Sequence, residues 1–417
     1  MLPHNIKTMK KYFSAILCIA CCCLFAITSC KNTSDGPEKV VNGVHIPELL
    51  ARKKANDTTG EYKAIHETYD KAIGLLQKDK NDAKAYLNLA TAFILEGRIT
   101  GNSSYYSNAA VKMLNTVLNA EEASQDQRFQ ALSLKSAVLL NMHQFKDALA
   151  VANEGVAING FNAGIYGALI DANVELGHYD EAVKDCDKML SIRPDLRSYS
   201  RASYLRQIHG DNRGAIDAMK MAVEAGVPGL EQTEWARVNL GDLYLNIGNL
   251  DSAGFMYSSS LMYRPDYPFA NMGLAKVYRA RKSYDSAIVY NKAAIKTLGE
   301  SAFVSFLADL YELKGDKEQA MKVRKDVVDL LEEGEQKQAK DATIPHNGNR
   351  ELAIAYMNVN DYNKALAYAK KDYDMRPDNI DANELMAWIS YLKGDVANAK
   401  MYAEKTAVTH THNANTR

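Results

Sequence analysis

One small residue recurs along this chain of 417 residues at a nearly constant spacing. The series consists of Ala148, Ala182, Ala215, Ala253, Ala287, Ala320, Ala365 and Ala399. Successive members are 34, 33, 38, 34, 33, 45 and 34 residues apart. A repeat of about 20 to 50 residues is typical of stacked structural units, each of which needs its neighbours to complete a core. The length alone would suggest two or three domains of roughly 150 residues, but the period predicts one continuous array.

Other residue types keep the same register as these alanines, which we call the register alanines. Nine residues before them stand Tyr244, Tyr278, Tyr311 and Tyr356. Five residues before them stand Gly177, Gly210, Gly248, Gly315 and Gly394, and twelve residues after them stand Pro194, Pro265 and Pro377. Glycine can take the positive φ of a tight turn, and proline cannot continue a helix. Each unit is therefore predicted to be two helices joined by a short turn.

The clearest copy of the unit contains Leu240, Gly241, Tyr244, Gly248, Ala253, Tyr257 and Pro265. This series resembles the tetratricopeptide repeat, except that Arg237 stands where the pattern has Trp. The resemblance implies an all-α fold, a right-handed α-α superhelix or solenoid of about ten helix-turn-helix repeats. We expect this solenoid to span residues 45–407.

Two stretches are expected to interrupt the array. Residues 98–107 are rich in Gly, Asn and Ser, which predicts a loop with Tyr105 and Tyr106 folding back onto the core. The single spacing of 45 residues predicts an insertion at 332–349. That insertion can be either a longer helix or a surface loop, because a charged stretch is followed by Pro and Gly.

The composition is that of a folded helical protein. Hydrophobic residues make up 47% and charged residues 24% of the chain, which excludes disorder as the main state. With 24 Gly and 9 Pro the chain is poor in turn-forming residues, which argues against all-β classes. The formal net charge of -1 provides no excess positive field, so nucleic acid is not expected as the main partner.

The N-terminal segment has the pattern of a secretory signal. Lys7, Lys10 and Lys11 precede the apolar run 15–27. At about 1.5 Å per residue this helix would reach only about 20 Å, well short of a hydrocarbon layer of about 30 Å. A permanent transmembrane helix is the weaker interpretation, although the longer run 12–29 leaves an uncleaved anchor as an alternative.

The sequence Ile27-Thr28-Ser29-Cys30 resembles a bacterial lipobox. The resemblance implies that residues 1–29 are removed as a lipoprotein signal peptide and that the Cys30 thiol carries a diacylglycerol. Residues 30–44 are then expected to form a flexible tether. An ordinary cleaved signal that happens to end near a Cys is the alternative. The expected location is the bacterial cell envelope, with the protein lipid-anchored to the outer membrane on its periplasmic or surface face.

The cysteines suggest no disulfide in the mature protein. Four of the six lie inside the predicted signal peptide and Cys30 would carry lipid, so only Cys186 remains. We expect Cys186 to act as a small buried hydrophobic residue.

Sequence motifs for catalysis, cofactors and metals were sought without success. There is no phosphate-binding G-x-x-x-x-G-K-[ST] loop and no G-x-G-x-x-G after a strand. His410 and His412 fall short of the three or four ligands of a stable metal site. We therefore expect no enzymatic activity, no cofactor and no metal, and a disordered tail at 408–417.

In tetratricopeptide proteins the first helices of successive repeats line a concave groove that holds an extended peptide or a partner's helix. Transferring those places residue by residue predicts a groove formed by Arg197, Arg201, Tyr204, Trp235, Asn239, Asp242, Lys276 and Arg279. Cations beside aromatic residues could bind carboxylates and cover apolar side chains. The alternative is that Trp235 fills the joint between two repeats and that the arginines form an ordinary solvated surface.

The resulting hypothesis is a lipid-anchored scaffold that binds a protein or peptide as part of an envelope assembly or secretion complex. An alternative is a surface glycan-binding lipoprotein of a nutrient-capture system, which binding to a panel of sugars would favour. A third class is an enzyme with a dispersed active site, for which loss of turnover on substitution of one carboxylate would be the sign.

Overall fold

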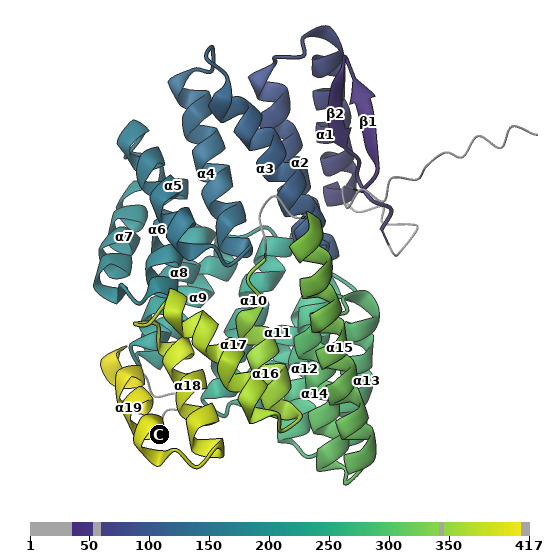
Figure 1. Cartoon of the computed structure of the whole chain (residues 1–417), viewed down its shortest axis with the longest axis vertical. Helices are drawn as coiled ribbons and strands as arrows, with labels where there is room; N and C mark the ends of the chain where they lie inside the picture. Colours follow the sequence, from purple (N-terminus) through teal and green to yellow (C-terminus); the bar gives the residue numbers. More distant parts are fainter. Residues whose placement is uncertain (1–35, 53–59, 342–345, 410–417) are drawn as a thin grey trace, which may run out of the picture. The chain divides into compact units, whose positions relative to one another are not determined.

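The computed structural model describes residues 36–52, 60–341 and 346–409. The predicted signal peptide, Cys30 and the expected tail beyond residue 409 lie outside these residues. The described part contains one β-hairpin followed by nineteen α-helices and a short 3₁₀ helix, Ala407–Thr409 (Figure 1).

The helices form nine consecutive antiparallel pairs, preceded by α1 (Gly60–Lys78). The first helices of the pairs are α2 (Ala83–Thr100), α4 (Gln125–Asn141), α6 (Ala163–Leu176), α8 (Leu196–Ile208), α10 (Glu231–Asn246), α12 (Pro268–Ala280), α14 (Ser301–Leu313), α16 (Asn349–Asn358) and α18 (Ile380–Leu392). The second helices are α3 (Ser103–Asn119), α5 (Phe145–Ile158), α7 (Tyr179–Ile192), α9 (Asn212–Glu224), α11 (Leu250–Tyr263), α13 (Tyr284–Thr297), α15 (Lys317–Asp341), α17 (Tyr362–Met375) and α19 (Val396–Thr406). The predicted all-α solenoid of helix-turn-helix units is confirmed, with nine pairs and one extra helix in place of ten pairs.

The turn inside each pair follows from local backbone chemistry. Gly177 ends α6 with φ 85°, a conformation that costs glycine nothing. Where the glycine is missing at the same place, a residue with a Cβ adopts the left-handed conformation: His143, Lys282 and Asn360 have φ 56°, 60° and 64°. The turn geometry is therefore kept even where the favoured residue is absent.

Tight packing between neighbouring pairs requires small residues at defined places. Tyr257 of α11 is fully buried between Gly241 of its own first helix and Gly273 of the next one. A Cβ on Gly241 or Gly273 would come within 2.5 or 2.3 Å of the Tyr257 ring. The Tyr257 hydroxyl donates a hydrogen bond of 2.8 Å to Asp242, so its one polar atom is satisfied. One second-helix side chain thus joins two successive pairs.

The β-hairpin corrects the predicted tether at 30–44. Strands β1 (Glu38–Val41) and β2 (Val44–Pro47) pair antiparallel around the Asn42-Gly43 turn, whose residues both have positive φ. Such Asn-Gly turns are the favoured two-residue hairpin connection. Ile46 is fully buried in the cluster formed by α1 to α3, and Tyr69 of α1 donates to the Pro47 carbonyl at 2.9 Å. From residue 38 onward the expected tether is therefore an ordered cap on the first helices.

The two predicted insertions are both mainly helical. Helix α2 runs to Thr100 and α3 begins at Ser103, so the expected loop at 98–107 shrinks to a two-residue turn. Tyr106 is buried, and its hydroxyl accepts from the Leu50 amide at 2.8 Å, which confirms that this segment folds back onto the core. The insertion at 332–349 lengthens helix α15 as far as Asp341.

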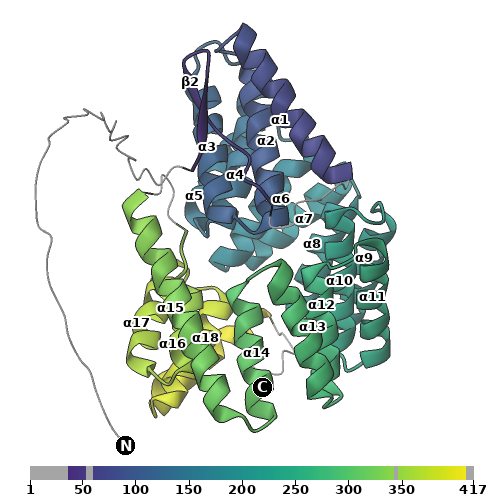
Figure 2. The same cartoon turned by 90° about the vertical axis from the view of Figure 1, so that its right-hand side faces the viewer.

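Segments about 200 residues apart in the sequence lie side by side within the solenoid (Figures 1 and 2). Hydrogen bonds join Tyr179 to Ile380, at a separation of 201 residues, and Glu61 to Arg264, at a separation of 203. Because each pair takes about 34 residues, the path returns to itself after about six pairs. We call the contact between these successive turns the inter-turn seam.

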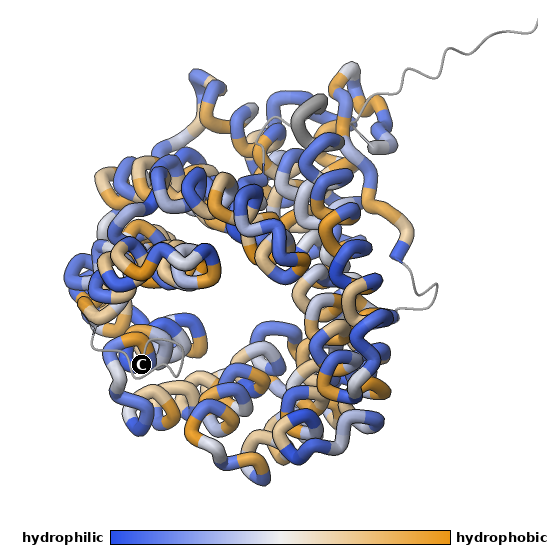
Figure 3. Tube along the Cα trace, turned by 60° about the horizontal axis from the view of Figure 1, so that its bottom comes forward, coloured by the Kyte–Doolittle hydropathy of each residue, from blue (hydrophilic) through white to orange (hydrophobic). Residues whose placement is uncertain are grey.

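Hydrophobic and hydrophilic residues are interspersed along the helices (Figure 3). This is the pattern of helices that bury one side against neighbours and expose the other. None of the described helices combines the length and apolar character needed to cross a membrane.

Candidate binding surface and inter-turn seam

The predicted groove residues lie on the first helices α8, α10 and α12, and most of their charges are already paired. Arg201 donates from Nε and Nη2 to the carboxylate of Asp171 on α6, at 2.8 and 2.6 Å. Lys276 donates to Asp242 at 2.9 Å, so α12 is joined to α10 in the same way. The Arg279 guanidinium lies over the Phe306 ring of α14, 4.6 Å from its centre. These cations tie neighbouring first helices together, a role that sequence reasoning missed.

The other predicted residues are more open. Arg197 is exposed, Trp235 is 36% exposed and Tyr204 is 43% exposed. The Asn239 side-chain amide donates to the Trp235 carbonyl at 2.8 Å, a bond within α10. The structure thus brings Arg201 and Lys276 into interhelical ion pairs and leaves the aromatic side chains accessible.

Tyr204 of α8 is 43% exposed, and other parts of the protein lie near its hydroxyl. The surrounding protein desolvates its hydroxyl, and this raises the pKa of Tyr204 far above the ordinary value; the charges of Asp381 and Glu175 raise it further. These carboxylates belong to α18 and α6.

Exposed aromatic residues recur on one side of the first helices. Both tryptophans of the chain are partly exposed there, Trp235 on α10 and Trp388 on α18. Trp388 and Tyr204 each stand eleven residues before the register alanine of their pair. Compared with that place, Trp235 stands seven residues earlier in its own pair and Tyr391 stands three residues later. Residues spaced by three, four or seven share one face of a helix. We call Tyr204, Trp235, Trp388 and Tyr391 the aromatic face. Sequence reasoning missed its last two members, although Trp388 occupies the same register place as Tyr204.

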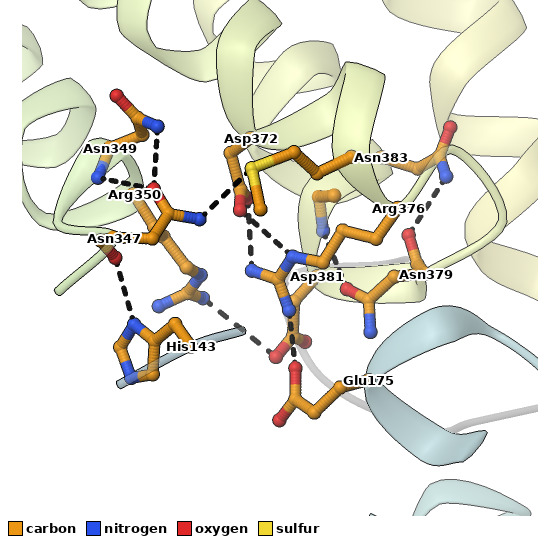
Figure 4. Close-up of polar contacts among 12 residues, drawn as sticks. His143, Glu175, Asn347, Asn349, Arg350, Asp372, Arg376, Asn379, Asp381 and Asn383 are labelled. Atoms are coloured by element: carbon orange, nitrogen blue, oxygen red, sulfur yellow. Dashed lines mark hydrogen bonds and ion pairs between the residues drawn. The ribbon is translucent and has the colours of Figure 1, made fainter. Parts of the chain in front are cut away.

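The inter-turn seam is centred on a buried arginine (Figure 4). Arg376, which follows α17 and is 4% exposed, donates from Nε and Nη2 to the two carboxylate oxygens of Asp372, at 2.9 Å each. Its Nη1 pairs with Glu175 at the end of α6, and its guanidinium lies over the Phe145 ring. Burial raises the pKa of Glu175, and the charge of Arg376 opposes that shift. Arg376 pairs with both Asp372 and Glu175. Its charge therefore offsets only part of the cost of burying the Glu175 carboxylate.

Backbone groups extend this contact on both sides of Arg376. The Asn379 side-chain amide donates to the Val174 carbonyl at 3.2 Å, and the Ile380 amide donates to the Tyr179 hydroxyl at 2.8 Å. The Asn347 amide donates to the Met142 carbonyl at 3.1 Å. Helices α4 to α7 are thereby joined to α16 to α18 by hydrogen bonds between distant parts of the chain.

Two turn glycines have a second role at the seam. A Cβ on Gly177 would lie 2.4 Å from the backbone carbonyl of Asp378, and a Cβ on Gly101 would lie 2.4 Å from Leu298. By contrast, a Cβ on Gly248 or Gly315, at equivalent turns, would have no neighbour within 4 Å. Every one of these glycines serves a turn, but only Gly101 and Gly177 also let another turn of the solenoid approach.

A second polar cluster joins the first helices to the middle of the chain. Glu231, at the start of α10, accepts from the Tyr267 hydroxyl at 2.9 Å and pairs with Arg98 of α2 at 2.5 Å. Glu61 of α1 accepts from the Glu231 amide at 2.9 Å and pairs with Arg264 at 2.5 Å. Two separate charged clusters therefore hold the successive turns in place.

A pocket of about 450 Å³ lies beside the seam, with Lys146, His178 and Met375 among its lining residues. The part of the chain that the structure describes has no group of three His, Cys, Asp or Glu side chains arranged to hold a metal ion. Cys186 is buried, as expected, and burial raises the pKa of its thiol to about 11.

Comparison with known proteins identifies the repeat. Residues 236–267 match the family model of the tetratricopeptide repeat. This match covers α11 and most of α10, the pair that contains Gly241 and Tyr257. No curated protein matches the sequence significantly.

Several solved structures are similar to this one at low identity. The APC/C hetero-tetramer Cut9-Hcn1 shares 15% identity at a TM-score of 0.48, covering 80% of this chain and 60% of that chain. Pseudomonas aeruginosa pilF shares 15% identity at a TM-score of 0.41, covering 49% of this chain and 93% of that chain. Yeast Tom70 shares 14% identity at a TM-score of 0.43, covering 83% of this chain and 82% of that chain. This chain thus spans 60% of the length of the first of them, and none assigns it an activity. The chain is an all-α solenoid of helix pairs that contains a tetratricopeptide repeat.

Proposed function

We propose that this protein is a non-catalytic scaffold that binds a partner protein or peptide on the aromatic face, while a lipid on Cys30 holds it in the bacterial cell envelope. The observation that carries the proposal is the exposure of Tyr204, Trp235 and Trp388, while Arg201 and Lys276 of the predicted groove are already paired with carboxylates. Tryptophan and tyrosine are enriched among the residues that dominate binding energy, because each buries a large area at little entropic cost. The fold itself is one suited to binding proteins.

The paired charges change how the predicted groove is expected to work. Arg201 and Lys276 already satisfy Asp171 and Asp242, so a partner's carboxylate would have to compete with those ion pairs. We therefore propose that these four residues hold neighbouring first helices together. The aromatic face is then the surface that contacts the partner. Arg197 and Arg279 are the exposed cations of the predicted set, and Arg279 already lies over the Phe306 ring.

The aromatic face gives a direct test. Replacing Trp235 and Trp388 together by alanine is expected to lower the yield of copurifying partners from gently solubilised membranes by about tenfold or more. Both residues are partly exposed, so the fold is expected to survive, as thermal unfolding would verify.

A matched control replaces Phe255 and Val289 by alanine, since these residues are 67% and 66% exposed on the second helices α11 and α13. This control is expected to retrieve the same partners as the wild type. Equal retrieval by both double variants would show that the aromatic face is not the binding surface.

The lipid anchor is proposed from the Lys-rich start, the apolar run and the lipobox resemblance that ends at Cys30. Each buried methylene contributes about 0.8 kcal/mol, so two or three acyl chains would hold the protein on a bilayer, whereas one would not. A Cys30→Ala variant is expected to lose incorporation of a labelled fatty acid and to leave the membrane fraction. Undiminished labelling of this variant would contradict the anchor and leave the binding surface untouched.

A further inference from the structure

Three carboxylates lie near the Tyr204 hydroxyl, where α8 approaches the start of α18. Desolvation by the surrounding protein raises the pKa of Tyr204, and the charges of Asp381, Glu175 and Asp171 raise it further. Burial also raises the pKa of Glu175, and the neighbouring Asp381 adds to that shift (Figure 4). Asp381 belongs to α18, and Asp171 and Glu175 belong to α6. Two turns of the solenoid therefore bring acidic groups together beside Tyr204.

Each of these carboxylates has an arginine partner, but the arginine is the more buried member of each pair. The exposed fractions of the side chains are 26% for Arg201 and 39% for Asp171, 4% for Arg376 and 35% for Glu175, and 37% for Arg350 and 44% for Asp381. Arg376 also pairs with the buried Asp372, and Arg350 lies 3.9 Å from Asp381. The charge that faces solvent beside Tyr204 is therefore predominantly negative.

Aromatic rings continue this acidic surface along α18. Trp388 stands seven residues after Asp381, so the two residues share one side of the helix. The Trp388 ring meets the Tyr391 ring edge to face, with 6.2 Å between the ring centres. Trp388 is 42% exposed and Tyr391 is 62% exposed. We call Tyr204, Asp381, Trp388 and Tyr391 the α8–α18 surface.

A cation is the ligand that both the rings and the carboxylates of this surface favour. The face of an aromatic ring attracts an ammonium or a guanidinium group. A carboxylate that is partly removed from water pairs with the same groups more strongly than one in bulk water. An anionic segment would be repelled by Asp381 and Glu175. An uncharged apolar segment would cover the rings but would desolvate these carboxylates without offering them a partner.

We infer that the α8–α18 surface binds a basic segment of the partner, with one lysine or arginine paired with Asp381 and another over the Trp388 ring. This assignment rests on the proposed function, because it takes the aromatic face as the binding surface and adds the chemistry that this face recognises. Seven residues of helix put Asp381 and Trp388 about 10 Å apart along α18. An extended segment covers that distance in about three residues.

Fluorescence anisotropy of labelled peptides, titrated with the full chain in mild detergent, tests this inference. The probe is a short peptide of alternating lysine and alanine, and its counterpart has glutamate in place of lysine. The wild type is expected to bind the lysine peptide more tightly than the glutamate peptide by about tenfold or more. Asp381→Asn and Trp388→Ala are each expected to weaken binding of the lysine peptide by about two- to fivefold.

Asp251→Asn is the matched control for the charge. Asp251 lies in the first turn of α11, as Asp381 lies in the first turn of α18, and the Asp251 side chain is 95% exposed. The control thus loses the same charge at the same place in a helix, and it is expected to bind the lysine peptide as tightly as the wild type. Thermal unfolding verifies that all three variants keep the fold.

Equal affinity of the wild type for the two peptides, or an equal loss of affinity in Asp251→Asn and Asp381→Asn, would overturn the inference. The proposed function is decided separately, by partner retrieval with the Trp235→Ala/Trp388→Ala variant. Loss of partners in that variant, together with a wild type that does not prefer the lysine peptide, would leave the binding surface in place and refute its preference for a basic segment.

Discussion

Replacing Gly177 by asparagine is expected to open the inter-turn seam while leaving the α6–α7 turn intact. Asparagine tolerates the left-handed conformation, and the chain itself places Asn360 at the equivalent turn, with φ 64°. A Cβ at residue 177 would, however, lie 2.4 Å from the Asp378 backbone carbonyl, which cannot move without shifting the start of α18. We expect a loss of about 1 to 3 kcal/mol in the free energy of unfolding by urea, together with faster amide hydrogen exchange in α16 to α18.

Gly315→Asn is the matched control for this variant. Gly315 has the same register place and φ 89°, but a Cβ there would meet nothing within 4 Å. Both substitutions carry the same cost of placing asparagine at positive φ. The difference between their losses of unfolding free energy therefore measures what the inter-turn seam contributes to stability. Equal losses of stability at the two positions would show that the contact between the turns contributes nothing.

Replacing Arg376 by methionine is expected to cost about 3 to 5 kcal/mol in the free energy of unfolding. Methionine keeps most of the side-chain volume above the Phe145 ring, so the main effect is electrostatic. Asp372 is 2% exposed and Glu175 pairs with the same guanidinium, and both carboxylates would be left without a buried cation. Denaturation by urea at neutral pH, followed by circular dichroism, gives the measurement.

A double-mutant cycle separates this charge effect from a packing defect. Adding Asp372→Asn to Arg376→Met removes one of the two uncompensated carboxylates, and we expect the double variant to recover about half of the lost stability. A double variant that is less stable than Arg376→Met by the full cost of Asp372→Asn alone would show that the two residues act independently.

The groove illustrates how far register reasoning reaches. The register predicts that Arg201, Tyr204 and Trp235 lie on first helices. Within one helix, the 3.6-residue period then fixes which side each residue faces. The register did not reveal that Arg201 pairs with Asp171, 30 residues away, or that Lys276 pairs with Asp242, 34 residues away. Pairing depends on the angle between adjacent helices, which the spacing of alanines does not specify.

The hairpin at residues 38–47 is a different kind of omission. Asn42-Gly43, flanked by Val40, Val41 and Val44, is a hairpin signal that is visible in the sequence. The Gly and Pro of the same segment instead favour the prediction of a flexible tether. A two-stranded hairpin is only marginally stable alone, and here it is held by Ile46 buried against α1 to α3.

The amino-acid sequence by itself determined the helix pairs, their turns and their order, because those depend on interactions within about 34 residues: periodic apolar positions, a small residue at each crossing and glycine at positive φ. The tertiary structure alone decided the inter-turn seam and the second role of Gly101 and Gly177. The physical reason is that the path of a solenoid sums small rotations from one pair to the next. Residues such as Glu175 and Arg376 meet only after about six such rotations have accumulated, so no local pattern records their contact.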